Sequence, residues 1–237
     1  MTNNYPPVLI LAGGLGTRIA DAYPDIPKYL VPLNGVPFAI QQLRLLKKMG
    51  FNEIILCVAY KKELIKALLG DGKKLGLHIQ YCEDDDQQLG TGGAIKKAAQ
   101  LVSSPFAVLY GDSYLDFDFL PVFQAFLNSK KSGLMTVYHN KNKWGKSNVV
   151  ISNGEIIAFD KENQTPEMAF IDYGFSLYSG TVFSCFKERY FDLSDVTKKL
   201  VHDKNLAVYE INHRFYEAGT VESIADLERY LHNEHGC

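Results

Sequence analysis

The sequence has no excess of charge of either sign. Its 237 residues include 25 Lys and Arg against 27 Asp and Glu, which gives a formal net charge of −2 at pH 7. Proteins that bind the nucleic-acid backbone cluster their basic residues, whereas the basic pairs of this chain are scattered. We therefore expect no nucleic-acid partner.

Long apolar runs and paired cysteines are also absent from the sequence. No apolar run approaches the roughly 18 residues that a membrane-spanning helix needs, so we expect no membrane partner. The four cysteines are widely spaced and form no C-x-x-C pair, which is typical of free thiols in a reducing compartment. No basic segment precedes the first apolar run, so a secretory leader is not predicted, and the expected location is cytoplasmic.

The first half of the chain alternates two kinds of apolar pattern. Short continuous runs indicate strands, and apolar residues three or four apart indicate helices. The expected strands cover residues 8–12, 54–59, 78–82 and 106–110, and the expected helices cover 38–48, 62–69, 93–101 and 120–129. This alternation predicts βαβ units and a mostly parallel sheet. Ligands bind beyond the carboxyl ends of such strands, so the residues that follow the first and fourth strands should face one crevice.

The second half of the chain is richer in strands and poorer in helices. Strand-like segments cover residues 134–139, 148–151, 156–159, 173–178 and 207–211, and a last helix is expected over 221–232. Asn153–Gly154 is typical of a tight hairpin turn. The sequence thus predicts the α/β class, with a Rossmann-like, mostly parallel sheet flanked by helices and a β-rich addition. No linker or repeat divides the chain, so we expect a single domain over residues 1–237.

The turn after the first strand, "LAGGLGTR" (Leu11–Arg18), places three glycines within four positions. Glycines let a ligand approach the main chain closely. The P-loop pattern is absent, the dinucleotide fingerprint lacks its third glycine, and the second strand ends in Tyr60–Lys62 without a carboxylate for a ribose. A dinucleotide-dependent oxidoreductase is therefore disfavoured. Arg18 and Lys28 beside several backbone N–H groups favour a phosphate site, and a turn that binds nothing stays open as the alternative.

Six segments in order resemble the signature of the sugar-1-phosphate nucleotidyltransferases, also called NDP-sugar pyrophosphorylases. They are "LAGGLGTR" with "PKYLVPLNGVPF", "EDDDQQLGTGGAIKKA", "LYGDSYL", "IIAFDKE", "IDYGFSLYS" and "FYEAGTVES". The second segment also resembles that of the heptose 1-phosphate guanylyltransferases.

The resemblance implies a GT-A-like fold and a reaction in which a nucleoside triphosphate and a sugar 1-phosphate give an NDP-sugar and pyrophosphate, with Mg²⁺ as cofactor. A nucleotide-binding part over residues 1–130 and a sugar-phosphate-binding part over 131–237 are expected. Members of the family often form oligomers, so a homo-oligomer is among the expected states.

On the nucleotide side, the resemblance implies Arg18, Lys28 and Asp112 as catalytic residues. Arg18 should neutralise the leaving pyrophosphate, and Lys28 should span the α-phosphate and the incoming phosphate. Asp112 is expected to hold Mg²⁺ together with Glu217, which stands where the family normally has Asp. The expected nucleotide-binding residues are Leu11, Ala12, Gly13, Gly14, Gly16, Thr17, Glu83, Leu89, Gly90, Thr91 and Gly111.

On the acceptor side, the resemblance implies that Lys161 grips the sugar phosphate, with Asp160 in the place of the family's Glu. Asp172 stands where the family has Asn and is expected, with Tyr173 and Gly174, to face the sugar. A carboxylate only accepts hydrogen bonds, whereas an amide also donates them. The identity of the acceptor therefore stays open between a sugar and a non-sugar phosphate, for example with CTP as the nucleotide.

The choice of base is expected to depend on Glu83 and the turn over residues 89–93. A carboxylate suits the N1–H and the exocyclic amine of guanine better than the edge of uracil, so the sequence favours GTP. A solvated acidic loop is the competing interpretation, because runs of charge usually face water. A catalytically silent nucleotide-binding regulator also stays open, although the presence of Arg18, Lys28, Asp112 and Lys161 counts against it.

Overall fold

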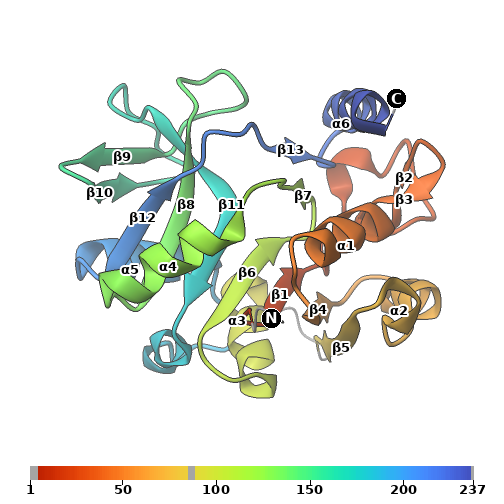
Figure 1. The fold of residues 1–237 in the computed structure, drawn as a ribbon, viewed down its shortest axis with the longest axis horizontal. Helices are drawn as coiled ribbons and strands as arrows, with labels where there is room; N and C mark the ends of the chain where they lie inside the picture. The colour runs from red at the N-terminus through yellow and green to blue at the C-terminus, as the bar shows by residue number, and fades with distance from the viewer. Residues whose placement is uncertain (1–4, 85–88, 236–237) are drawn as a thin grey trace.

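The computed structural model describes residues 5–84 and 89–235. Its first half forms the parallel part of a nine-stranded sheet (Figure 1). The four strands run in the order β5 (His78–Glu83), β4 (Glu53–Val58), β1 (Val8–Leu11) and β6 (Phe106–Tyr110), each parallel to the next. The predicted α/β fold class, with a Rossmann-like arrangement of strands and helices, is confirmed.

The second half extends the same sheet with mostly antiparallel strands. β11 (Phe170–Tyr178) pairs antiparallel with β6 and so joins the two halves. The other strands of this part are β8 (Gly133–His139), β9 (Val149–Ser152), β10 (Glu155–Phe159) and β12 (Leu206–Glu210). β8 pairs with β11 and β12, and β9 pairs with β10 and with the start of β11. The strands assigned to the nucleotide and the acceptor therefore belong to one continuous sheet.

Helices cover both faces of the sheet because neighbouring residues of a strand point to opposite sides. Val8 and Ile10 lie in one apolar cluster, whereas Leu9 lies in the other. The first cluster contains buried residues of α1 (Phe38–Lys48), α2 (Lys62–Leu69), α4 (Phe119–Ser129) and α6 (Val221–His235). The second contains buried residues of α3 (Gly90–Ala98) and α5 (Leu193–His202).

Helix α5 was not predicted from the sequence. Asp192 and Asp195 form a capping box at its start, in which each side chain accepts a hydrogen bond from the other residue's backbone N–H. Leu193, Val196 and Leu200 then bury one face. Both signals are present in the sequence, but the helix has only 10 residues between strand-like segments. Helix α3 also begins earlier than expected, at Gly90 rather than residue 93.

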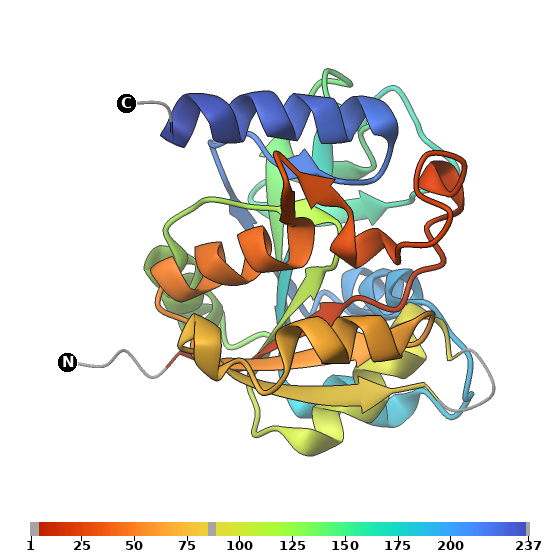
Figure 2. The same cartoon turned by 90° about the vertical axis from the view of Figure 1, so that its right-hand side faces the viewer.

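Short elements position the loops around the carboxyl ends of the strands. β2 (Pro32–Leu33) pairs with β3 (Val36–Pro37), and β7 (Ser113–Tyr114) pairs with β13 (Tyr216–Glu217). Helix α6 lies at the upper right of Figure 1, beside β13 and the β2–β3 hairpin, and Figure 2 shows it running across the top of the molecule. The last helix thus fixes the segment that carries Glu217. Within the described residues, no helix is long and apolar enough to cross a membrane.

Candidate active site

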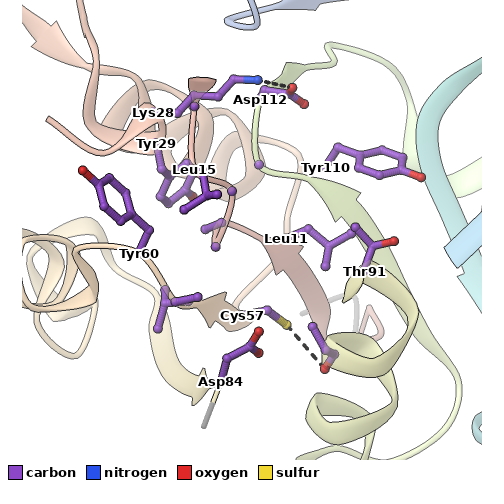
Figure 3. Close-up of a pocket in the computed structure, with 18 of the residues that line it drawn as sticks. Leu11, Leu15, Lys28, Tyr29, Cys57, Tyr60, Asp84, Thr91, Tyr110 and Asp112 are labelled. Atoms are coloured by element: carbon purple, nitrogen blue, oxygen red, sulfur yellow. Dashed lines mark hydrogen bonds and ion pairs between the residues drawn. The ribbon is translucent and has the colours of Figure 1, made fainter. Parts of the chain in front are cut away.

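A cavity of about 620 Å³ opens beyond the carboxyl ends of β1, β4 and β6 (Figure 3). Its position agrees with the rule that open α/β sheets bind ligands at this edge. Many of the residues predicted from the sequence line it: Leu11, Ala12, Gly13, Gly14, Gly16, Thr17, Lys28, Gly90, Thr91, Gly111 and Asp112. The turn after β1 and the start of α3 therefore share one cavity with the end of β6.

Two glycines of this region are required by close packing. A Cβ at Gly111 would overlap the carbonyl oxygen of Leu11 and lie 3.0 Å from Cα of Ala12. Gly16 has φ +66°, and a Cβ there would lie 3.0 Å from Cβ of Lys28. The turn thus packs directly against both the end of β6 and the tract that supplies Lys28.

Lys28 and Asp112 form an ion pair inside the cavity, with 2.6 Å between Nζ and Oδ2 (Figure 3). Their side chains are 15% and 25% exposed. The pair holds the Lys28 ammonium inside the cavity, where an anionic group of a ligand could replace Asp112 as its partner.

Glu217 lies next to this pair on β13, although it is not part of the cavity wall. The β13–β7 ladder places Glu217 opposite Ser113, and the Ala218 N–H donates to the Asp112 carbonyl at 2.7 Å. Burial and the nearby Asp112 carboxylate raise the pKa of Glu217, while Arg18 and Lys28 act to lower it. Three of the other predicted residues, Arg18, Lys28 and Asp112, therefore act electrostatically on Glu217.

The two carboxylates fit a magnesium ion. Mg²⁺ usually binds one or two protein carboxylates together with waters and substrate phosphates, and Asp112 with Glu217 supplies that number. Burial, and then repulsion by the Asp112 carboxylate, raise the pKa of Glu217, and a bound cation would relieve that repulsion. Among the described residues no set of three or more His, Cys, Asp or Glu is grouped for a metal, so the remaining ligands would come from substrate and water.

On the acceptor side, the structure brings Lys161, Asp172 and Gly174 together. Lys161 Nζ lies 3.0 Å from Asp172 Oδ2. The other carboxylate oxygen of Asp172 accepts the Gly174 N–H at 3.0 Å, at a break in the β11–β8 register. Gly174 has φ +96° there, which favours glycine. The ion pair is thus built into a bulge of β11.

Asp160 and Tyr173 do not join this group. Asp160 accepts the N–H groups of Glu162 and Asn163 at 2.8 and 3.0 Å and so closes the loop after β10. Tyr173 is 1% exposed and belongs to the apolar cluster on one face of the sheet. Its neighbour Asp172 points to the other side, because side chains alternate along a strand.

Glu83, which was expected to bind the base, has different partners in the structure. Its carboxylate lies 2.7 Å from Lys62 and 2.8 Å from Lys66, both on α2. The hydrogen bonds from Lys62 and Lys66 lower the pKa of Glu83 to about 2. The next residue, Asp84, lines the cavity instead. Leu89 is buried and is not part of the wall, and residues 85–88 of this predicted segment lie outside the described residues.

Comparison with known proteins indicates to which family this chain is related. The model of a family described as "Nucleotidyl transferase" matches residues 7–234. A D-glycero-alpha-D-manno-heptose 1-phosphate guanylyltransferase of Campylobacter jejuni is 35% identical over 179 residues, which cover 75% of this chain and 78% of the relative. This chain belongs to the nucleotidyl transferase family. The resemblance predicted from the motifs is confirmed, and the protein is a nucleotidyltransferase.

Other relatives and solved structures agree with this assignment. A second heptose 1-phosphate guanylyltransferase, of Aneurinibacillus thermoaerophilus, is 29% identical over 75% of this chain and 76% of its own. HddC from Yersinia pseudotuberculosis, solved in complex with GMP-PN, superposes with a TM-score of 0.78 at 23% identity and covers 96% of this chain and 100% of its own. An inositol-1-phosphate CTP transferase from T. maritima gives a TM-score of 0.78 at 17% identity with 100% coverage of both chains. The last two share the fold.

Several residues that line the cavity were not predicted from the sequence. The end of β4 contributes Cys57, Val58, Ala59 and Tyr60, which the strand-end rule would have identified. Tyr110 was overlooked beside the more obvious Gly111–Asp112. Tyr190 and Asp192 come from the segment that leads into the unpredicted helix α5.

The segment before α5 reaches the cavity through tight contacts with α3. The Gly92 N–H donates to the Phe191 carbonyl at 3.0 Å, and a Cβ at Gly92 would overlap the Phe191 ring. Thr91 Oγ1 accepts the Leu193 N–H at 2.8 Å and contacts Asp192 Oδ1 at 3.2 Å. The glycines after Leu89 therefore serve helix packing as well as the cavity.

Proposed function

We propose that this nucleotidyltransferase makes an NDP-sugar, by transferring GMP from GTP to the 1-phosphate of a heptose or hexose with release of pyrophosphate, and that it uses Mg²⁺. The observation that carries the proposal is the 620 Å³ cavity at the strand ends, which holds Lys28 paired with Asp112 beside a turn of exposed main-chain groups. The guanylyltransferase names of the relatives support the choice of reaction.

The proposed reaction forms one P–O bond and breaks another. An oxygen of the sugar phosphate attacks the α-phosphorus of GTP, and the bond to the β-phosphate oxygen breaks, so that pyrophosphate leaves with its electron pair. The protein forms no covalent bond, so positioning and charge neutralisation supply the catalysis.

Each charged residue has a defined part in this step. Lys28 bridges the α-phosphate and the attacking phosphate, and Arg18 neutralises the pyrophosphate as it leaves. Lys161 holds the acceptor phosphate. Asp112 and Glu217 would hold Mg²⁺, which neutralises charge on the phosphates when bound.

Asp84, rather than Glu83, supports the choice of GTP as the nucleotide. It follows the last residue of β5 and lines the cavity, and its Oδ2 accepts the Leu89 N–H at 3.4 Å. A carboxylate in this wall suits the two donors on one edge of guanine, whereas uracil presents a single N–H there. HddC, which shares the fold, was solved in complex with GMP-PN.

Two alternatives remain. A non-sugar phosphate with CTP is supported by the fold shared with the inositol-1-phosphate CTP transferase. A silent regulator is disfavoured because Arg18, Lys28, Asp112 and Glu217 are all present together. We place the reaction in the cytoplasm, consistent with the free thiols of Cys57 and Cys185.

The test is pyrophosphate release with Mg²⁺ across the four ribonucleoside triphosphates, each with a panel of hexose and heptose 1-phosphates and inositol 1-phosphate. Release with GTP and a sugar 1-phosphate, lost in Asp112→Asn and lowered selectively for GTP in Asp84→Asn, is the expected result. Release with CTP and inositol 1-phosphate alone would contradict the proposal. Triphosphate binding without release for any pair would point to the regulator.

A further inference from the structure

Tyr110 lies on the boundary between the nucleotide cavity and the acceptor side. It is the last residue of β6, two positions before Asp112, and its ring lines the cavity. In Figure 3 the ring points away from Leu15 and Lys28, with the hydroxyl at its far end. That hydroxyl accepts a hydrogen bond from Lys161 Nζ at 3.1 Å.

The Lys161 ammonium is held by several groups. It pairs with Asp172 at 3.0 Å and lies 4.7 Å from the centre of the Tyr110 ring and 5.7 Å from that of Phe159. An ammonium has three N–H donors, and Asp172 and the Tyr110 hydroxyl take one each. The Lys161 side chain is 38% exposed, so an incoming oxygen can approach the third.

The charges around Lys161 keep it protonated. Burial acts to lower the pKa of Lys161, but Asp172 and Tyr110 outweigh burial and raise it. Asp172 is itself held, since its backbone N–H donates to Asn148 Oδ1 at 2.9 Å and its Oδ1 accepts the Gly174 N–H. The ammonium is therefore oriented before any acceptor arrives.

We propose that Tyr110 is a positioning residue for the acceptor: its ring is fixed in the nucleotide wall, and its hydroxyl aims Lys161 at the phosphate of the sugar 1-phosphate. The inference rests on the proposed function, because it assumes that Lys161 binds the acceptor phosphate. One side chain thereby ties the geometry of the acceptor site to that of the nucleotide site.

The test compares Tyr110→Phe with the wild type in pyrophosphate release. The variant keeps the ring and removes only the hydroxyl. We expect the KM for the sugar 1-phosphate to rise about fivefold, the effect of one hydrogen bond of about 1 kcal/mol. The KM for the triphosphate and kcat should change less than about twofold, because the lost contact acts on acceptor binding alone. An unchanged acceptor KM, or a rise confined to the triphosphate KM, overturns the proposal.

Tyr209→Phe is the matched control, since it removes a phenol hydroxyl from β12 of the same sheet, outside the cavity wall. A double-mutant cycle with Lys161→Met then separates positioning from structure. If Tyr110 acts through Lys161, Tyr110→Phe adds no further rise in acceptor KM in the Lys161→Met background. A full additional fivefold rise there contradicts the proposal. A wild type that releases no pyrophosphate would instead refute the proposed function.

Discussion

The two sides of the candidate active site use different chemical groups: mainly glycine-rich main chain on the nucleotide side, and a side-chain ion pair on the acceptor side. On the nucleotide side, the glycines that follow β1 and β6 line the cavity, and a few side chains supply charge. On the acceptor side, an antiparallel strand bulges at Asp172 to bury a carboxylate against Lys161. Main-chain groups are the same in every sequence, whereas an ion pair depends on two particular side chains. The acceptor side is therefore the part in which a change of sequence alters specificity most readily.

The largest expected effect is on the nucleotide side, from Lys28→Ala. The variant loses the cation that faces the reacting phosphates and leaves the Asp112 carboxylate without its 2.6 Å partner. We expect kcat/KM to fall by about 100- to 1,000-fold, as when one preorganised electrostatic contact is removed. Steady-state pyrophosphate release measures it. Lys48→Ala, which removes a lysine that is 75% exposed and 3.7 Å from Asp116, should leave the rate unchanged; a comparable loss there would show that the effect is not local.

The second-largest expected effect tests whether the stability of the protein depends on close main-chain packing on the nucleotide side. Gly111→Ala places a methyl group against the Leu11 carbonyl and Cα of Ala12. We expect a loss of about 1–3 kcal/mol in the free energy of unfolding, as for other overpacked sites, measured by urea denaturation. Gly14→Ala is the matched control, because nothing lies within 4 Å of its added Cβ. Equal losses in both variants would contradict the role given to close packing.

A smaller effect on the acceptor side should separate the two sites. Asp172→Asn keeps an oxygen that can accept the Gly174 N–H but removes the negative partner of Lys161. We expect the KM for the sugar 1-phosphate to rise about tenfold, which corresponds to about 1.4 kcal/mol. The Kd for the triphosphate, measured by calorimetry, should not change. A weaker triphosphate Kd with an unchanged acceptor KM would show that the assignment of the two sides is reversed.

The smallest expected effect comes from Glu83, which lies outside the cavity wall and pairs with two lysines of α2. Its pKa is lowered from 4.5 to about 2 by Lys62 and Lys66, so it stabilises the fold above pH 4.5 and this contribution is lost as the pH falls toward 2. Because Glu83 and its partners are about one-third exposed, the contribution should be only about 0.5 kcal/mol. Glu83→Gln should flatten the fall of Tm below pH 4.5 without changing base preference. A changed base preference would restore the original prediction for Glu83.

The fold could be predicted from the sequence wherever one pattern ran undisturbed. Strands β1, β4 and β6 are short apolar runs that are mostly buried, and the glycine turn and Gly111–Asp112 lie at the strand ends, where they were expected. Helix α5 was missed although its capping box and apolar spacing are legible in the sequence.

The structure differs from the sequence prediction at single positions. Glu83 and Asp84 are neighbours, as are Asp172 and Tyr173, and neighbours in an extended segment face opposite sides. The sequence pattern located these pairs but could not choose which member lines the cavity or pairs with Lys161, since that depends on register. Tyr190 and Asp192 reach the cavity through contacts between segments about 100 residues apart, which no local pattern contains.

The fit of Phe191 against Gly92 has a consequence for protein engineering. The Phe191 ring occupies the space that a Cβ at position 92 would need. The start of α3 and the segment before α5 are therefore complementary in shape. Replacing residues 89–93 alone with the corresponding segment of another nucleotidyltransferase would introduce side chains that do not fit the retained segment before α5. A functional chimera should therefore exchange residues 89–93 and 189–193 as a single cassette.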